Sequence, residues 1–259
     1  MTAALEMTGV AVDIAGRRIV EAIYLTVSHG EVVGLLGANG CGKTTLLRAA
    51  LGLARNTRGE SKLNGRAVED LRDDERARLV GYLPQERRVG WNLPAWRVAA
   101  LGVPHLPPAR AREAALAALA DVQMSHLADR GVLDMSGGER ARVLLARLLA
   151  TGAPLLIADE PAAGLDPDAQ LLVMEILRAR ADAAAAAVLV TLHDLGLAAR
   201  GCDRLVVMAD GRVVADGPPR EALTPQVLRE AFRLEGGFGE SDGLALRISR
   251  RQPAKAAKA

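Results

Sequence analysis

The stretch from Gly37 to Thr44, Gly-Ala-Asn-Gly-Cys-Gly-Lys-Thr, constrains the fold of this chain more than any other part of it. It fits the pattern G-x-x-x-x-G-K-[ST], which is typical of a loop that binds phosphate groups. The apolar residues 31–36 before it predict a strand, and residues 45–50 after it predict the first turns of a helix. A glycine-rich turn before a helix is the simpler interpretation, but it does not account for the strand, the lysine and the threonine in register. The stretch therefore predicts a strand, a phosphate-binding loop and a helix, in that order.

The residue types in this loop match the chemistry of phosphate binding. Glycines let the backbone approach the phosphates and turn successive N–H groups toward the anion, and the helix N-terminus adds its positive dipole end. Lys43 can neutralise the β- and γ-phosphates of a nucleotide, and the Thr44 hydroxyl can ligate Mg²⁺. We therefore expect the following residues to bind the nucleotide: Gly37, Ala38, Asn39, Gly40, Cys41, Gly42, Lys43, Thr44 and Thr45.

Length, composition and charge narrow the class of protein. The chain has 259 residues, 50% of them hydrophobic, which is enough for one sizeable core with an inserted subdomain. A net charge of +2 and an aromatic content of 2% leave no basic stripe with interleaved aromatics, so we expect no nucleic-acid partner. No apolar stretch reaches about 18 residues and the N-terminus does not resemble a signal peptide, so we expect no membrane span. Cys41 and Cys202 lack metal-ligand spacing, and a disulfide at Cys41 would obstruct the phosphate loop, so we expect a reducing cytosol.

The hydrophobic pattern predicts an α/β fold. Residues 5–14 and 19–27 alternate like the strands of an N-terminal antiparallel portion. Continuous apolar runs, such as 154–158 and 188–192, alternate with helical stretches such as 167–182. This alternation predicts a mainly parallel sheet that is covered on both faces.

Changes of composition and hydrophobic spacing along the chain also predict the domain organisation. From about residue 94 to residue 150 the chain is rich in Ala, Leu and Arg with helical spacing, so we expect an inserted helical subdomain. The Gly-rich and then basic end predicts a flexible tail. We expect one domain over 1–235, built from a core of 1–86 and 153–235 and a helical subdomain of about 87–152, followed by a tail over 236–259.

Two acids, Asp159 and Glu160, directly follow an apolar run. Carboxylates at the end of a buried strand are costly unless they serve a metal or a reaction. In a phosphate-loop protein Asp159 would hold Mg²⁺, and Glu160 would polarise the water that attacks the γ-phosphate. An N-cap cluster for the helix after Pro167 is the alternative, but it does not explain why a buried run leads straight into two acids.

A second candidate anion site is the run Ser136-Gly137-Gly138-Glu139, which opens a predicted helix. A serine followed by paired glycines places a hydroxyl and free N–H groups at a helix N-terminus. A serine N-cap is common, so the run gains its weight from its position just before the acidic strand.

Taken in order, these motifs resemble the nucleotide-binding subunits of ABC transporters. The phosphate loop, Gln85, the Ser136-Gly-Gly signature, the two acids, Gly164-Leu-Asp166 and Thr191-Leu-His193-Asp match the family one by one across about residues 5–235. The signature separates this family from other phosphate-loop ATPases. The resemblance implies a phosphate-loop NTPase core of the ABC ATPase type with an inserted helical subdomain.

The resemblance also implies a mechanism. Two copies of the chain would enclose two ATP molecules with Mg²⁺, each between the phosphate loop of one copy and Ser136, Gly137, Gly138 and Glu139 of the other. Gln85 would sense the γ-phosphate or Mg²⁺, Asp166 would couple the two sites, and His193 would contact the γ-phosphate. Closure on ATP and reopening after hydrolysis would drive membrane partners. Those partners would be multi-helix permease subunits in separate chains, docked along residues 86–105 at the cytoplasmic face of the inner or plasma membrane.

The chain departs from the family pattern at Ile14, where an aromatic residue usually stacks on adenine. Isoleucine can pack on a base face but lacks the ring, so Ile14 is the expected adenine contact in a weaker form. Tyr24 is the nearest aromatic, and we expect it to pack into the core.

A local cluster around Tyr82, Trp91–Pro94 and 101–105 resembles subunits of importers for iron–siderophore complexes, haem or cobalamin, which work with a substrate-binding protein. Zinc or manganese importers and exporters keep the same ATP motifs and stay open as alternatives. A soluble ABC protein of translation or repair would need two cassettes or a long insert, and a non-hydrolytic regulator would not need Glu160 and His193.

Overall fold

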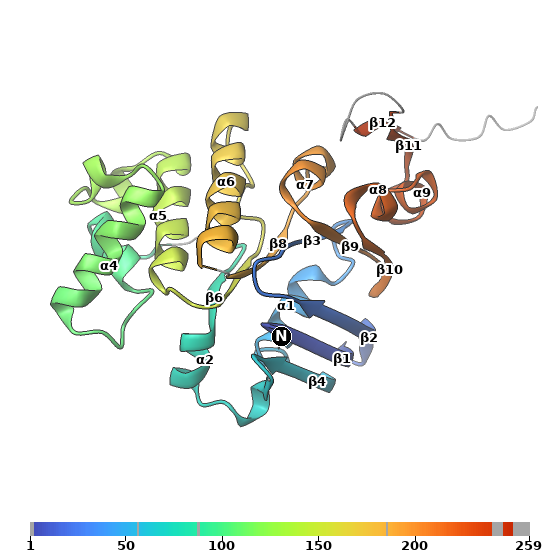
Figure 1. Ribbon diagram of the computed structural model, residues 1–259, viewed down its shortest axis with the longest axis horizontal. Coiled ribbons are helices and arrows are strands. Elements are labelled where there is room, and N and C mark those ends of the chain that lie inside the picture. Colours follow the sequence, from blue (N-terminus) through green and yellow to red (C-terminus); the bar gives the residue numbers. More distant parts are fainter. Residues whose placement is uncertain (1–2, 56, 87–88, 185, 240–245, 251–259) are drawn as a thin grey trace, which may run out of the picture.

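A six-stranded sheet forms the centre of the computed structural model, which describes residues 3–55, 57–86, 89–184, 186–239 and 246–250 (Figure 1). Its strand order is β10-β9-β3-β8-β7-β6, and all neighbours are parallel except the hairpin of β9 and β10. The strands are β3 (Val32–Gly37), β6 (Val80–Leu83), β7 (Leu155–Ala158), β8 (Ala187–Thr191), β9 (Arg204–Ala209) and β10 (Arg212–Gly217). Every residue of β3, β7 and β8 is buried, which explains their continuous apolar runs and confirms the mainly parallel sheet.

Helices cover both faces of this sheet. Alternate strand residues such as Val33 and Leu35 join one buried cluster, together with α1 (Lys43–Ala50) and the N-terminal strands. Val32 and Leu36 join the other, together with α6 (Pro167–Ala184) and α7 (Leu195–Gly201). Successive side chains of a strand point to opposite faces, so each apolar run supplies two layers of core at once. The remaining helices of this part are α2 (Asp73–Leu79), α8 (Pro219–Ala222) and α9 (Pro225–Phe232), with a 3-10 turn η1 (Val68–Asp70).

A separate antiparallel sheet lies at the N-terminal side, in the order β2-β1-β4-β5 (Figure 1). It consists of β1 (Leu5–Ile14), β2 (Arg17–Val27), β4 (Thr57–Leu63) and the short β5 (Arg66–Ala67). The expected antiparallel portion is thus confirmed, but the expectation that Tyr24 packs into the core is wrong. Its neighbours Ile23 and Leu25 face the core, so strand alternation turns Tyr24 outward, where it is 66% exposed.

A group of helices protrudes on the left of Figure 1, where the helical subdomain was predicted. It contains α3 (Ala95–Ala100), α4 (Pro108–Asp121) and α5 (Gly137–Ala150), with 3-10 turns η2 (Ser125–Leu127) and η3 (Val132–Asp134). Small and branched residues fill its centre, among them Ala99, Ala115, Leu119 and Leu145. An ion pair between Arg180 of α6 and Asp121 at the end of α4 ties this subdomain to the core.

Part of the predicted tail is ordered in the structure. Residues 234–238 form β11 (Leu234–Phe238) and pair antiparallel with β12 (Leu246–Arg250). The prediction of a flexible tail from residue 236 is therefore wrong for these two strands, because β11 packs against α9. Residues 251–259 of that prediction lie outside the described residues. No helix in the described ranges is long and apolar enough to cross a membrane.

Candidate functional site

The phosphate loop connects β3 to α1 at the carboxyl edge of the parallel sheet. Gly42 caps α1 with φ 106°, and a Cβ atom there would lie 2.9 Å from the carbonyl oxygen of Ile19. A Cβ atom at Gly37 would lie 2.5 Å from both Cys41 Sγ and the carbonyl oxygen of Met208. Only glycine fits at these two positions, so the loop has its predicted place because the neighbouring strands leave no room for side chains.

Lys43 is the first residue of α1, and its side chain is buried although it is charged (6% exposed). Its Nζ donates to the carbonyl oxygens of Gly37 at 2.8 Å and of Ala38 at 3.2 Å. A buried ammonium needs such partners, and here the loop itself supplies them. The positive charge therefore stands over the loop and is satisfied by groups that a bound phosphate could replace.

Asp159 follows β7 and is completely buried (0% exposed). Its Oδ2 accepts a hydrogen bond from the Thr44 hydroxyl at 2.7 Å, and its backbone N–H donates to the carbonyl oxygen of Leu83 at 2.8 Å. The predicted neighbourhood of Thr44 and Asp159 is thus present. A hydroxyl and a carboxylate oxygen beside a phosphate loop are the donor set that suits Mg²⁺, which takes few protein ligands when phosphates supply the rest. In the described ranges no group of three or more His, Cys, Asp or Glu side chains could hold a metal ion by itself.

Glu160 adopts a left-handed backbone conformation with φ 53°. This conformation costs a non-glycine residue about 1–2 kcal/mol. Its Oε1 lies 2.6 Å from His193 Nε2, and the Glu160 side chain is far more buried than the imidazole (11% against 43% exposed). A strained backbone at the end of a central strand points to a functional role for the residue, because the energetic cost is tolerated in order to place the carboxylate.

One cavity of about 330 Å³ brings these parts together. Loops at the carboxyl ends of parallel strands meet there, which is where ligands bind in open α/β sheets. The predicted residues that are not among those lining it are Gly37, Ala38, Cys41, Ile14, Asp159, Asp166 and the run from Ser136 to Glu139. It is lined by Ile19, Asn39, Gly40, Gly42, Lys43, Thr44, Thr45, Gln85, Glu160 and His193.

Ile19 was not predicted but lines this cavity, whereas Ile14 does not. Ile14 ends β1 and is 51% exposed, whereas Ile19 of β2 reaches the cavity next to Gly42. The strand alternation of β2 would have shown that Ile19 is half-buried, but not that β2 passes beside the loop.

Ser136 caps α5 in the helical subdomain, away from this cavity. The Glu139 N–H donates to Ser136 Oγ at 3.2 Å, and the Ser136 N–H donates to Glu139 Oε2 at 2.8 Å. These reciprocal bonds form a capping box, and the hydrogen bonds from Ser136 lower the pKa of the Glu139 carboxyl. Ser136, Gly137, Gly138 and Glu139 are therefore in the predicted helix-start geometry, but none of them lines the phosphate-loop cavity.

Asn92 fixes the loop that leads to Ser136. Its Oδ1 accepts the N–H of Leu133 at 2.9 Å, and its Nδ2 donates to Asp134 Oδ2 at 2.9 Å. Arg140 of α5 holds the same loop from the other side by donating to the carbonyl oxygens of Val132 and Met135 at 3.1 and 3.2 Å. Asn92 thereby connects the segment that follows Gln85 to the start of α5.

Asp166 is exposed and caps α6. Its Oδ1 accepts the N–H of Ala169 at 2.9 Å. This gives Asp166 a structural role within its own chain and leaves its predicted role between two copies a prediction.

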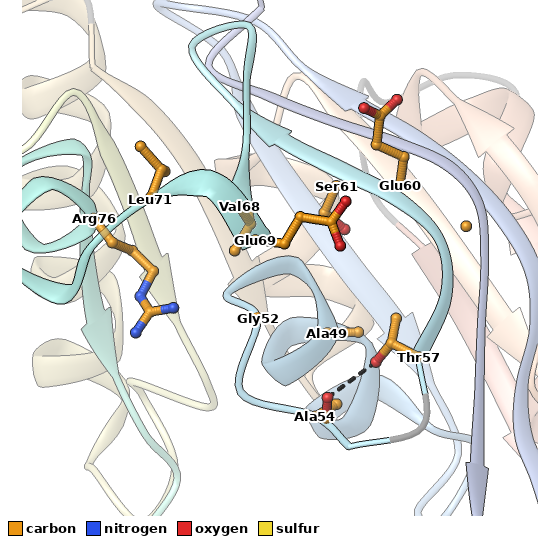
Figure 2. A pocket seen from close by; sticks show the side chains of 11 residues that line it. Ala49, Gly52, Ala54, Thr57, Glu60, Ser61, Val68, Glu69, Leu71 and Arg76 are labelled. Carbon is orange, nitrogen blue, oxygen red and sulfur yellow. Dashed lines mark hydrogen bonds between the residues drawn. The ribbon is translucent and has the colours of Figure 1, made fainter.

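A further cavity of about 390 Å³ lies at the C-terminal end of α1 (Figure 2). The end of α1, β4, η1 and α2 surround it, and Thr57 Oγ1 donates to the carbonyl oxygen of Ala54 at 3.1 Å at its rim. Its charged lining residues are Glu60, Glu69 and Arg76. None of the phosphate-loop residues lines it, so it is separate from the nucleotide site.

The model of the ABC transporter family matches residues 20–163. This stretch contains the phosphate loop, Gln85, the Ser136 signature and both acids. The chain belongs to the ABC transporter family.

Several curated ABC proteins are similar to this chain. The cobalamin import ATP-binding protein BtuD of Halobacterium salinarum is 42% identical over 232 residues, which covers 88% of this chain. The chain spans 58% of the length of that relative. The hemin import ATP-binding protein HmuV of Bordetella avium is 39% identical over 241 residues, covering 89% of this chain and 92% of the relative. HmuV of Myxococcus xanthus is 42% identical over 241 residues, covering 89% and 90%.

Solved ABC structures share the fold. The dimeric cassette MJ0796 bound to ADP and Pi superposes with a TM-score of 0.75 at 26% identity, covering 83% of this chain and 99% of that chain. The protein cbiO1 of Clostridium perfringens, part of the transporter complex cbiONQ, superposes with a TM-score of 0.78 at 25% identity, covering 88% and 93%. These likenesses confirm the predicted ABC ATPase fold.

Proposed function

We propose that this chain is the ATP-hydrolysing subunit of an ABC importer for an iron–siderophore complex, haem or cobalamin. The observation that carries the proposal is the convergence of Lys43, Gln85, Glu160 and His193 on one cavity. The names of the similar proteins, which are cobalamin and hemin import subunits, support the import direction and the class of cargo.

Binding of ATP would use the loop in its observed shape. The backbone N–H groups of the loop and the α1 N-terminus attract the phosphates, and the Lys43 ammonium exchanges the carbonyl oxygens of Gly37 and Ala38 for phosphate oxygens. Thr44 and Asp159 would hold Mg²⁺, which neutralises phosphate charge when bound. Ile19, with Ile14 beyond it, offers an apolar surface to the base.

Hydrolysis would depend on Glu160 and His193. Glu160 would polarise the attacking water and accept its proton, and His193, 2.6 Å away, would hold that carboxylate in place while facing the γ-phosphate. Gln85 lies at the same cavity and would report the presence of the γ-phosphate to the helical subdomain.

Ser136, Gly137, Gly138 and Glu139 would complete the site of a second copy, because they lie outside the cavity of their own chain. Asp166 would pass the state of one site to the other. The dimeric solved cassette with ADP and Pi supports this arrangement. Two copies would then work with multi-helix permease chains docked along residues 86–105, and indirectly with a substrate-binding protein, at the cytoplasmic face of the membrane.

The test is affinity purification of the tagged full chain from solubilised membranes, followed by mass spectrometry. We expect a multi-helix permease to accompany the chain. Uptake of labelled haem, cobalamin or ferric siderophore by cells with and without the gene then identifies the cargo. Recovery with ribosomal or repair factors and without a membrane protein would overturn the importer assignment. Recovery with an exporter permease would overturn only the proposed direction of transport.

A further inference from the structure

One hydroxyl group joins the two acids of the site. Thr191 is the last residue of β8, and its side chain is completely buried (0% exposed). Its Oγ1 donates to Asp159 Oδ1 at 2.6 Å and accepts the backbone N–H of Glu160 at 2.7 Å. A hydroxyl has one proton to give and lone pairs to accept with, so it satisfies both partners at once.

Buried polar side chains are few in this chain, and they gather here. Among the described residues, those that are polar or charged and buried are Lys43, Asp159 and Thr191. The first two belong to the nucleotide and metal chemistry derived above. Burying a hydroxyl is unfavourable unless it has a hydrogen-bond partner, and the partners of Thr191 are the two acids of this site. Thr191 is therefore a candidate for a role in the same site.

The two bonds of Thr191 act on different parts of their neighbours. Asp159 already accepts the Thr44 hydroxyl at Oδ2, so the bond at Oδ1 fixes the carboxylate at both oxygens and sets its plane. Glu160 has the unfavourable φ of 53°, and the bond to its N–H holds the backbone in that conformation. The same conformation directs the Glu160 side chain toward His193.

The position of Thr191 cannot be filled by its strand neighbours. Val188, Leu189 and Val190 are buried and apolar, and β8 pairs with β7 so that Ala158, the residue before Asp159, lies opposite Val190. The hydroxyl is therefore the polar group that this strand end offers to Asp159 and Glu160.

We propose that Thr191 is a positioning residue for hydrolysis: its hydroxyl orients the Asp159 carboxylate for Mg²⁺ and the Glu160 backbone for water activation. The inference rests on the proposed ATP hydrolysis and on the Mg²⁺ ligands proposed for it. It adds a residue to which neither the motifs nor the comparisons assign a role.

The test compares Thr191→Val, which keeps the size and the β-branch but replaces the hydroxyl by a methyl group, with Thr191→Ser, which keeps the hydroxyl. Four quantities are measured on the purified full chain. They are kcat and KM for ATP, the Mg²⁺ concentration for half-maximal turnover, and Mn²⁺ affinity by electron paramagnetic resonance with a non-hydrolysable ATP analogue. Removing a residue that orients a metal ligand typically weakens metal affinity or activity about 10- to 100-fold.

We expect Thr191→Val to lower kcat and weaken Mn²⁺ binding at least about 10-fold, with nucleotide affinity in EDTA unchanged within about two-fold. We expect Thr191→Ser to restore the metal dependence of the wild type. A Thr191→Val protein with the metal dependence and kcat of the wild type would overturn the inference. So would equal losses in both variants, because the hydroxyl that serine keeps would then not be enough to preserve the metal dependence.

If Thr191→Val does not fold, Thr191→Cys replaces it, because a thiol fits the same space but is a weaker donor and acceptor. A shifted metal dependence in that variant supports the inference, and an unchanged one overturns it. A wild-type protein without ATP turnover would instead refute the proposed hydrolysis itself, so the two failures are distinguishable.

Discussion

His193 Nε2 lies 2.6 Å from Glu160 Oε1, so the imidazole and the carboxylate form a direct pair at the edge of the phosphate-loop cavity. The pair joins the end of β7 to the loop after β8, and with Thr191 it makes a second connection between the same two strand ends. Because Glu160 is the more buried partner, the accessible face of the pair is the imidazole. In the proposed hydrolysis, Glu160 would be the base and the more exposed imidazole of His193 would face the γ-phosphate.

Replacing Glu160 by Gln tests the base directly. The amide keeps the size of the side chain and its oxygen, but it cannot accept a proton. We expect ATP affinity within about two-fold of the wild type and a kcat at least about 100-fold lower, since general-base catalysis typically contributes that much. Phosphate release and binding of a fluorescent ATP analogue measure the two quantities, and size-exclusion chromatography with ATP should show a trapped dimer. Glu175→Gln, at an exposed site on α6, is the matched control, and turnover at the wild-type level in Glu160→Gln would refute the role.

The base-binding surface is tested at Ile14 and Ile19. We expect Ile19→Ala to weaken ATP binding about 3- to 10-fold, because burying the removed methyl and methylene groups against a base is worth about 1 kcal/mol. We expect Ile14→Tyr to tighten binding, because an added ring can stack on the base. Isothermal titration with ATP measures both, and Ile248→Ala, a half-exposed isoleucine on β12, is the control. Unchanged dissociation constants in the first two variants would place the base elsewhere.

The two hydrogen bonds by which Asn92 holds the loop before Ser136, here called the Asn92 clasp, are tested by Asn92→Leu. The change removes both bonds to the loop before Ser136, and a lost hydrogen bond costs about 1 kcal/mol. If that loop sets the signature for a second copy, kcat should fall several-fold while ATP affinity of the isolated chain stays the same. Steady-state turnover and nucleotide titration separate the two effects. Asp134→Asn, which keeps an acceptor for Asn92, should lose less, and a variant with only a lower melting temperature would reduce the clasp to a structural role.

The Cys202 thiol makes stability depend on alkaline pH. Burial raises its pKa to about 12 from the ordinary 9.0, with a smaller contribution from the charge of Asp203. Between these two values the unfolded chain loses the proton while the folded chain keeps it, so the free energy of unfolding should fall as pH rises from 9 toward 12. The contribution is fully present below pH 9, where both states are protonated.

Urea unfolding at pH 8, 10 and 11 of the wild type and of Cys202→Ala checks this. We expect the wild type to lose on the order of 2 kcal/mol more than the variant by pH 11. Cys202→Ser, which does not titrate in this range, should follow the alanine variant. Identical slopes in all three proteins would mean that the thiol is not protonated beyond its ordinary range.

The local parts of the site could be predicted from the sequence, and the contacts across the sheet could not. The phosphate loop is a contiguous pattern, so Lys43 could be predicted from it. Carboxylates directly after a buried apolar run are costly unless they have a function, so Asp159 and Glu160 could be predicted as well. Thr191 stood inside a recognised motif, but its role depends on β7 and β8 being neighbours in the sheet, which is a property of strand order. Ile19 was missed for the same reason, since its place beside the loop comes from the packing of β2 against Gly42.

Two structural expectations were wrong, one about Tyr24 and one about the C-terminal tail. Tyr24 was expected in the core because it lies on a predicted strand, yet its parity in β2 turns it outward. The strands β11 and β12 were missed because their glycine-rich and basic composition is typical of a solvated end, whereas the packing of β11 on α9 orders them. Strand parity therefore decides the first case, and packing against α9 decides the second.

The separation of Ser136 from the cavity around Lys43 has a genetic consequence. In a pair of copies that exchange these parts, a copy with a damaged lysine still contributes an intact serine, and a copy with a damaged serine still contributes an intact lysine. One composite site of a mixed pair then carries both lesions and the other carries neither. Two alleles that are each inactive alone would therefore complement one another when one affects the phosphate loop and the other affects the Ser136 signature, and would fail to do so when both affect the phosphate loop.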